Sequence, residues 1–193
     1  MIHFKNVTAD DTEALAYWEK IYMEAFPVEE RAPLDILVAL TQDVPGAQMP
    51  IVYDDDQAVG IIFLNNMAND KALILYLAMD ASLRGQGYGS KVLAALQATY
   101  PQGIILETEM LDVNAENATQ RERRYEFYNR NGMQDSNLMS YTLGGVFHLM
   151  RSTTYITMDD YLKGIDELGA IPGIPTFVFN KSNLDTFRTF VGA

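Results

Sequence analysis

Residues 73–100 join an apolar strand, a glycine-rich turn and an amphipathic helix, and this segment limits the possible folds more than any other. The turn contains three glycines within five positions, in the order Arg84-Gly85-Gln86-Gly87-Tyr88-Gly89. Glycines leave the main chain bare where the helix begins, and the N–H groups and helix dipole at that point attract anions. The segment therefore predicts a phosphate-binding turn, to which Arg84 adds a charged contact.

The composition indicates a soluble globular protein. The chain has 193 residues, of which 48% are hydrophobic and 21% charged, enough for one domain with its own core. It has no apolar run of the roughly 20 residues that a bilayer-spanning helix needs. The first residues, Met1-Ile2-His3-Phe4-Lys5, lack the long apolar stretch of a signal peptide. We therefore expect a cytoplasmic protein with no membrane partner.

The absence of cysteine excludes disulfides, thiolate metal sites and a cysteine nucleophile. Because the chain has only two histidines, His3 and His148, we expect no metal site. Lysine and arginine number 14 against 26 aspartates and glutamates, a formal charge of −12. This acidity argues against a nucleic-acid partner. It favours a cationic small molecule through long-range attraction, although an acidic surface also serves solubility.

Hydrophobic periodicity gives the order of elements. Strands are predicted at residues 2–7, 50–53, 59–64, 73–79, 103–109, 137–143 and 146–150, with an antiparallel meander over residues 50–79. Helices are predicted from a cap at Thr8 or Asp10 to Phe26, from Pro33 in a segment that Pro45-Gly46 closes, and at 88–100, 118–131 and 157–168. Pro172 and Pro175 break the chain before a last helix that Ser182 caps. The expected fold class is α/β (α+β), with one domain at 1–151 and a helical extension at 152–193 packed on it.

Two other phosphate-binding motifs fit the turn less well. A nucleotide-binding loop of the Gly-x-x-x-x-Gly-Lys-Ser/Thr type requires lysine after glycine, whereas Gly89-Ser90-Lys91 inverts this ending. The dinucleotide fingerprint nearly matches Gly85-x-Gly87-x-x-Ser90, with Glu107 about 20 residues further on. However, its third glycine is a serine, and the turn begins several residues after the strand instead of directly behind it.

A third motif fits better. Arg84-x-x-Gly87-x-Gly89, preceded by Leu77-Ala78-Met79, resembles the acyl-CoA signature of the GCN5-related N-acetyltransferase (GNAT) family. Further on, Phe127-Tyr128-Asn129-Arg130-Asn131-Gly132-Met133 resembles the family's Phe-Tyr-x-x-x-Gly-Phe segment, with methionine in place of the last aromatic residue. The likeness covers roughly residues 2–150. It implies the acyl-CoA N-acyltransferase fold, a mixed, mostly antiparallel twisted sheet flanked by helices, with acetyl-CoA as cosubstrate.

The resemblance also assigns residues to the CoA site. It implies that main-chain amides from Gln86 to Ser90 hold the pyrophosphate, and that a bulged strand 75–79 pairs with the pantetheine arm. The Met79 amide is then a candidate donor to the thioester oxyanion. Because the chain has no cysteine, direct attack by an amine is favoured over an acyl-enzyme. The expected CoA-binding residues are Leu77, Ala78, Met79, Arg84, Gly85, Gln86, Gly87, Tyr88, Gly89 and Ser90.

Tyr128 matches the family tyrosine that can protonate the departing CoA thiolate, since a phenol with a pKa of about 10 stays protonated at neutral pH. The alternative is a core aromatic that shares the buried helix face with Tyr125. The identity of the general base is left open, because strand 73–79 lacks the glutamate of many relatives and Tyr76 is its only ionisable residue. Glu107 and Glu109 alternate on one strand and point the same way. Either could take the amine proton through water, both could be a solvated strand end, and a neutral amine would need no base.

The acceptor is the least constrained part. Phe26-Pro27-Val28-Glu29-Glu30-Arg31 resembles a stretch in uncharacterised bacterial GNAT proteins. Because this region borders the acceptor site in relatives, Glu29, Glu30 and Arg31 either select the acceptor or form a surface charge cluster. His148 is read as a core or edge histidine. Arg121, Arg123 and Arg124 either reach the CoA 3′-phosphate or line a solvated helix face.

The prediction is acetylation of a small, cationic amine. The alternatives are a CoA-binding module without catalysis and, more remotely, a dinucleotide-dependent oxidoreductase. The extension either covers the acceptor site or forms a homodimer contact, and the sequence leaves both open.

Overall fold

The fold was analysed in a computed structural model, which describes residues 1–142, 145–169 and 176–191. The chain forms two compact units, Met1–Gln102 and Gly103–Ala193. No helix in the described ranges combines the length and apolar character that crossing a membrane requires. The expected division into a domain at 1–151 and an extension at 152–193 stays a prediction.

The first unit is built on an antiparallel sheet. Its strands follow the order β1 (Ile2–Asn6), β3 (Pro50–Asp54), β4 (Gln57–Met67) and β5 (Lys71–Met79), and the short strand β2 (Ala47–Gln48) pairs with β4. Every residue of β4 from Val59 to Asn65 is buried, as expected for a central strand covered on both faces. The predicted meander of residues 50–79 is confirmed, whereas β2 was not predicted.

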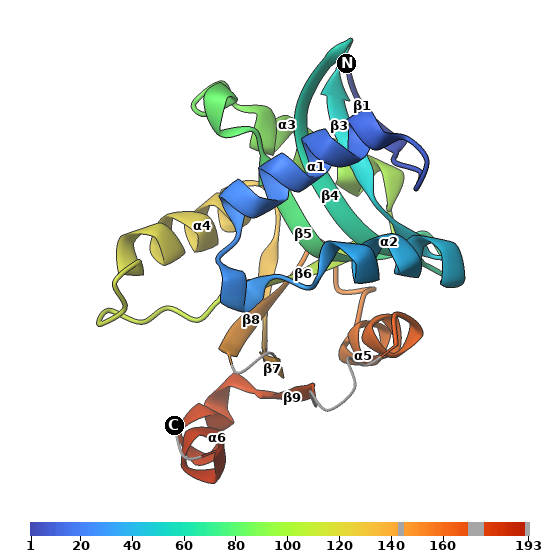
Figure 1. The fold of residues 1–193 in the computed structure, drawn as a ribbon. Helices are drawn as coiled ribbons and strands as arrows, with labels where there is room; N and C mark the ends of the chain where they lie inside the picture. Colours follow the sequence, from blue (N-terminus) through green and yellow to red (C-terminus); the bar gives the residue numbers. More distant parts are fainter. Residues whose placement is uncertain (143–144, 170–175, 192–193) are drawn as a thin grey trace. The chain divides into compact units, whose positions relative to one another are not determined.

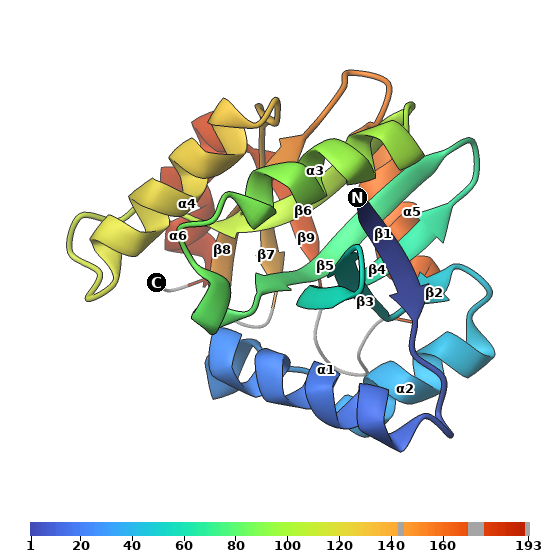
Figure 2. The same ribbon diagram turned by 90° about the horizontal axis from the view of Figure 1, so that it is seen from above.

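Helices cover both faces of this sheet. The helices α1 (Thr12–Ala25) and α2 (Leu34–Asp43) lie on one face, and α3 (Tyr88–Thr99) lies on the other (Figures 1 and 2). The α1 face that meets the sheet carries Trp18, Ile21 and Tyr22, all buried, and the Trp18 indole N–H donates to the Ile62 carbonyl at 3.3 Å. The short 3-10 turns η1 (Val28–Glu30) and η2 (Ala81–Leu83) lie between α1 and α2 and between β5 and α3.

The predicted cap of the first helix was wrong. Asp11, and neither Thr8 nor Asp10, is the N-cap, and its carboxylate accepts from the Ala14 amide at 3.0 Å. All three residue types cap helices well, so residue type alone did not fix the register. The predicted end is confirmed, since α1 stops at Ala25 before Pro27.

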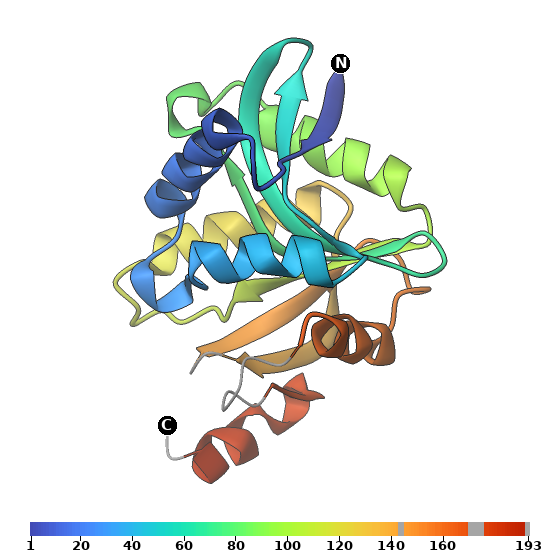
Figure 3. The ribbon, with the colours of Figure 1, turned by 45° about the vertical axis from the view of Figure 1, so that its right-hand side comes forward.

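The second unit has its own antiparallel ladder. Its strands follow the order β6 (Gly103–Glu109), β8 (Gly145–Arg151), β7 (Gln134–Thr142) and β9 (Phe177–Asn180). The helix α4 (Ala118–Arg130) packs against β6 and β7. Gly132, with φ 83°, follows it in the predicted left-handed conformation. The remaining helices are α5 (Met158–Glu167) and α6 (Leu184–Val191), the latter beyond β9 at the sheet edge (Figure 3).

The C-terminal segment starts as predicted and then departs from the prediction. Thr157 and Asp160 form both arms of the predicted capping box at the start of α5, and the staple residues Ile156 and Tyr161 are fully buried. The strand β9 was not predicted. Ser182 does not cap the last helix but lies within the 3-10 turn η3 (Lys181–Asn183) that precedes it. The predicted breaks at Pro172 and Pro175, and the end of the strand predicted at 137–143, lie outside the described residues.

Candidate functional site

The glycine turn leads into α3 with its main chain bare. Gly85 and Gly87 have φ of 80° and 76°, and a Cβ on either would have no heavy atom within 4 Å. The glycines are therefore required by backbone conformation, and the space around them is open. Gly87 is the N-cap and supplies no side-chain hydrogen bond. The first intrahelical bond runs from the Lys91 amide to the Gly87 carbonyl at 3.3 Å.

It follows that the amides of Tyr88, Gly89 and Ser90 have no acceptor within their own helix. Three main-chain donors, the positive end of a helix dipole and an open cradle together suit a phosphate. The turn can therefore bind a phosphate through main-chain groups alone, without a side chain.

Contacts on both sides hold the turn in place. Before it, the Asp80 carboxylate accepts from the Ser82 amide and hydroxyl at 2.9 and 2.6 Å. These bonds with Ser82 hold the pKa of Asp80 below its ordinary value. After it, Lys91 pairs with Asp54 at 3.1 Å. Arg84 is exposed, and in the described part of the chain its side chain has no ion pair or hydrogen bond, so it remains available to an anion.

The strand β5 carries the bulge that the family resemblance implied. Its pairing with β4 shifts register between Tyr76 and Ile74, which leaves Leu75 without a partner on β4. Further along, Gly60 of β4 faces Met79, and a Cβ on Gly60 would lie 2.4 Å from the Ala78 carbonyl oxygen. Glycine is thus needed there for the close approach of the two strands.

The same register sets the direction of the Met79 amide. The Asp80 amide donates to the Val59 carbonyl at 2.9 Å, and Gly60 faces Met79. In an antiparallel ladder the N–H groups of Met79 and Leu77 then point away from β4. This direction is the one that a main-chain donor to a ligand along β5 requires.

Tyr76 is the only ionisable residue among residues 73–79, and its hydroxyl is engaged with main-chain groups instead of being free to act as a base. Its hydroxyl donates to the Glu30 carbonyl at 3.0 Å and accepts from the Ala32 amide at 3.1 Å. The Tyr22 hydroxyl donates to the Ala32 carbonyl at 3.1 Å. The two tyrosines therefore fix the main chain around η1, the predicted acceptor segment. Sequence reasoning missed this clamp, because its partners are main-chain groups 44 and 46 residues away from Tyr76.

In the second unit, Glu107 of β6 is partly exposed and accepts hydrogen bonds from described residues at only one of its two carboxylate oxygens. The hydroxyls of Ser140 from β7 and Tyr161 from α5 both donate to its Oε1, the latter at 2.6 Å. Burial raises the pKa of Glu107 despite these two bonds, which act in the opposite direction. A carboxyl group with a raised pKa and an unshared oxygen is suited to proton transfer.

Glu109, two residues further along β6, is only 6% exposed and has other partners. Its carboxylate binds the Arg124 guanidinium, lies 3.2 Å from Arg121 Nε and accepts from Asn117 Nδ2 at 2.9 Å. Arg121 also donates to the Met110 carbonyl at 3.1 Å. Both oxygens of Glu109 are therefore occupied, and two of the three arginines proposed for CoA contacts help to hold α4 against β6.

Tyr128 lies in the last turn of α4, 8% exposed. Burial raises its pKa, although Arg124 nearby acts to lower it, so the phenol is protonated at neutral pH. Within the described residues, the Tyr128 hydroxyl has no hydrogen-bond partner, and it is not one of their fully buried polar atoms. The ring is therefore buried while the hydroxyl keeps some exposure. This feature separates Tyr128 from Tyr125, whose hydroxyl donates to Asp135 at 2.9 Å.

His148 is a core histidine, as predicted. It is 3% exposed, its Nδ1 lies 3.1 Å from the Asp135 carboxylate, and its ring packs on Tyr125 at 5.1 Å. The nearby His148 ring, together with bonds from Lys181, the Asn137 amide and Tyr125, overcomes the effect of burial and lowers the pKa of Asp135. Among the described residues, no three His, Cys, Asp or Glu side chains are grouped as a metal site would require.

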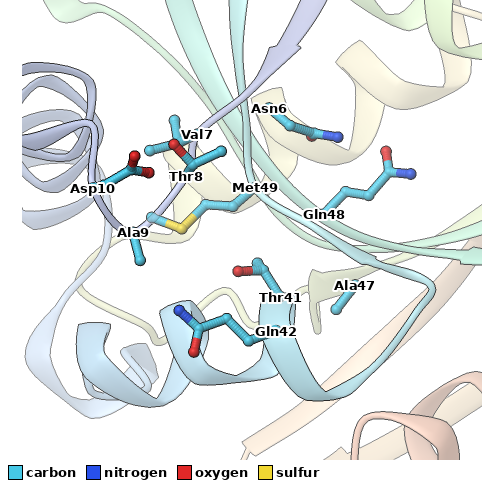
Figure 4. A pocket seen from close by; sticks show the side chains of 10 residues that line it. All are labelled: Asn6, Val7, Thr8, Ala9, Asp10, Thr41, Gln42, Ala47, Gln48 and Met49. Carbon is cyan, nitrogen blue, oxygen red and sulfur yellow. The ribbon is translucent and has the colours of Figure 1, made fainter.

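A separate hollow of about 400 Å³ lies in the first unit between the end of β1 and the segment from α2 to β3 (Figure 4). No predicted site residue lines it. Its lining mixes neutral polar and apolar side chains with one carboxylate: Asn6, Val7, Thr8, Ala9, Asp10, Thr41, Gln42, Ala47, Gln48 and Met49.

Comparison with known families confirms the resemblance noted in the sequence. The model of the acetyltransferase (GNAT) family matches residues 15–133, more than half of the chain. The chain belongs to the GNAT family of acetyltransferases. Membership makes it an N-acetyltransferase with acetyl-CoA as cosubstrate, and the expected mixed, mostly antiparallel fold with a C-terminal helix is confirmed. No protein with a curated description matches the chain.

Solved structures share this fold. A protein from Bacteroides thetaiotaomicron assigned to the GNAT family is 26% identical, with a TM-score of 0.69 over 88% of this chain and 97% of that one. An aminoglycoside 6'-N-acetyltransferase from Enterococcus faecium has a TM-score of 0.56 at 16% identity, covering 81% and 98%. A spermidine N-acetyltransferase chimera of Vibrio cholerae SpeG and hSSAT has a TM-score of 0.56 at 16% identity, covering 83% and 98%.

Proposed function

We propose that this GNAT enzyme transfers the acetyl group of acetyl-CoA directly to a small, cationic amine. The observation that carries the proposal is the start of α3, where the left-handed Gly87 leaves three consecutive amides without an acceptor in their helix. We assign the CoA diphosphate to the amides from Gln86 to Ser90, with Gly85 shaping the turn and Arg84 as a charged contact.

The pantetheine arm is assigned to β5 at Leu77, Ala78 and Met79. The Met79 N–H points away from β4, and we assign it to the thioester oxygen, where negative charge develops as the amine attacks. The nitrogen–carbon bond forms first, and the carbon–sulfur bond then breaks as the carbonyl re-forms, so the electron pair of that bond leaves with the CoA sulfur. A main-chain donor is already oriented and needs no rearrangement as the charge forms.

Tyr128 is assigned as the acid that protonates the departing thiolate. Its raised pKa keeps the proton on the oxygen, and its hydroxyl has no hydrogen-bond partner in the described structure to compete with the sulfur. Positioned acids of this kind contribute roughly 10²- to 10⁴-fold to a rate.

Glu107 is assigned as the base that takes the proton from the amine, directly or through water. Its pKa is raised by burial and only Oε1 is engaged by Ser140 and Tyr161. Glu109 is the second candidate. It ranks after Glu107 because both of its oxygens already accept bonds from the α4 arginines and Asn117. An acceptor that binds as the neutral amine would need neither carboxylate.

The acceptor is assigned to the segment that the Tyr22 and Tyr76 hydroxyls fix, which includes Glu29, Glu30 and Arg31. The formal charge of −12 favours a cation. Relatives of the same fold are named for acetylating aminoglycosides and spermidine, and both kinds of compound carry several amino groups. The preference for a cationic acceptor rests on these two observations.

Thiol release tests the proposal. The protein with acetyl-CoA is offered spermidine, an aminoglycoside, a peptide with a free N-terminus and a neutral-side-chain amino acid amide. We expect free CoA thiol with at least one polycationic amine and much less with the amide. Absence of thiol with every amine, although calorimetry shows acetyl-CoA binding, would instead support a CoA-binding module without catalysis. The missing glutamate on β5 favours that second candidate.

A further inference from the structure

Glu107 receives its hydrogen bonds unevenly. The Ser140 and Tyr161 hydroxyls, from β7 and α5, both donate to Oε1, and Oε2 has no hydrogen-bond partner among the described residues. Ser140 and Tyr161 are fully buried, whereas Glu107 is partly exposed. One oxygen is therefore fixed inside the protein and the other is left to the accessible side.

Tyr161 comes from the C-terminal segment, beyond the residues that the GNAT model matches. Its position is over-determined, because the Thr157–Asp160 capping box sets the first turn of α5 and the buried Ile156 packs before it. A rigid helix start thus delivers a buried phenol to within 2.6 Å of the carboxylate. Burial and the nearby Glu107 raise the pKa of Tyr161, so the phenol remains a donor.

We propose that Tyr161, with Ser140, is a positioning residue that fixes Glu107 Oε1 and presents Oε2 as the proton-accepting atom for the incoming amine. The proposal rests on the proposed function, in which Glu107 is the base. It gives α5 of the extension a role in the reaction, because α5 carries the Tyr161 hydroxyl that holds the base.

The groups that face Glu107 within the second unit determine how its carboxyl group titrates. Tyr161 is the titratable group that faces it from α5, and Ser140 faces it from β7 without a charge. On β8, its register partner is Leu149. Glu109 on the same strand is balanced by Arg121 and Arg124 from α4. The protonation of Glu107 therefore depends mainly on burial and on the two hydroxyl donors.

The test is the pH profile of kcat in Tyr161→Phe. The phenol stabilises the ionised carboxylate, so its removal raises the pKa of Glu107 and moves the acid limb of the profile to higher pH. Below that limb we expect kcat to fall roughly tenfold, the effect of about one pH unit, while the alkaline plateau and the KM for acetyl-CoA are kept. The profile is measured with two amines from the thiol panel that differ in their own pKa, because a limb set by the enzyme stays at the same pH with both.

Tyr125→Phe is the matched control. It removes another tyrosine hydroxyl that donates to a carboxylate in the same unit, Asp135 at 2.9 Å, and should leave the limb in place. Ser140→Ala removes the second donor to the same oxygen and should move the limb in the same direction, which also serves if Tyr161→Phe does not fold.

Two failures are distinguishable. If the wild-type protein releases no thiol with any amine, the proposed function itself is overturned. If the wild-type protein turns over and the acid limb stays where it was in Tyr161→Phe or Ser140→Ala, with activity reduced equally at all pH values, the residues are structural and only this inference fails.

Discussion

The glycine turn of the first unit and the Glu107 cluster of the second unit are built in opposite ways. The turn presents main-chain donors from consecutive residues, and its side chains contribute little beyond Arg84. The cluster joins three side chains separated by 33 and 54 residues along the chain. Consecutive main-chain donors need only the local backbone conformation, whereas the cluster needs β6, β7 and α5 to be correctly placed.

This difference predicts how each region tolerates change. The turn should be sensitive to a single Cβ, because left-handed backbone is the one thing that other residues supply poorly. The second unit should be sensitive to single hydroxyl groups, since each one has been brought to a defined place by distant elements. The predictions below test this contrast.

The largest expected effect is that of Tyr128→Phe in the second unit. Loss of the acid should lower kcat about 100-fold and leave the CoA dissociation constant unchanged in calorimetry. Tyr100→Phe is the matched control, because Tyr100 is equally 8% exposed and burial also raises its pKa. A Tyr128→Phe enzyme with normal turnover would return Tyr128 to the role of a core aromatic.

A smaller effect is expected from Gly87→Ala in the first unit. An alanine at φ 76° costs about 1–2 kcal/mol of backbone strain, and relief of this strain would turn the amides away. We expect CoA binding to weaken about tenfold or more, as measured by calorimetry. Gly169→Ala is the control, since Gly169 has φ 75° and is also in open space. Equal loss of CoA affinity in both variants would point to general strain and not to the turn.

Tyr76→Phe should have a moderate effect on the acceptor and none on CoA. It removes the bonds to the Glu30 carbonyl and the Ala32 amide, which we expect to cost about 1–2 kcal/mol of unfolding free energy and to raise the KM of the amine several-fold. Tyr22→Phe removes one bond to Ala32 and should show the same change at a smaller size. A normal amine KM in both variants would mean that the η1 segment does not bind the acceptor.

The smallest expected effect is on the pH dependence of stability. The pKa of Asp135 is depressed in the folded protein, so its contribution is present above its unfolded pKa of about 3.9 and is lost as pH falls below it. Wild-type unfolding free energy, from urea titrations, should therefore fall about 1 kcal/mol more between pH 5 and pH 3 than that of Asp135→Asn. Asp80→Asn, which changes a local turn of the first unit, should alter this slope less. Equal slopes in all three proteins would contradict a special role for the Asp135 network.

Local signals accounted for most of what the sequence could predict. The strand-turn-helix segment, the Gly132 cap and the Thr157–Asp160 box were recognisable because each depends on neighbouring residues. The missed elements, β2 and β9, are 2 and 4 residues long, too short for a period to emerge. Asp11 was missed as a cap because Thr8, Asp10 and Asp11 are almost equally suited to that position.

The candidate site was predicted unevenly for the same reason. Glu107 and Glu109 were indistinguishable by strand alternation, yet one meets hydroxyls from β7 and α5 while the other meets arginines from α4. Likewise, nothing local marks Tyr76 as a clamp or Tyr161 as a partner of Glu107. A tyrosine at a hydrophobic position is typical of a core residue, and only long-range contacts reveal what its hydroxyl does.

The central claim is that main-chain donors from Gln86 to Ser90 hold the CoA diphosphate. The most direct measurement is an amide ¹⁵N–¹H NMR titration of the intact protein with CoA, with calorimetry on the same sample. The account predicts heat of binding and large shifts at the Gly87, Gly89 and Ser90 amides, while the Gly132 and Gly169 amides stay in place. Binding without shifts in the turn, or no binding at all, would contradict it.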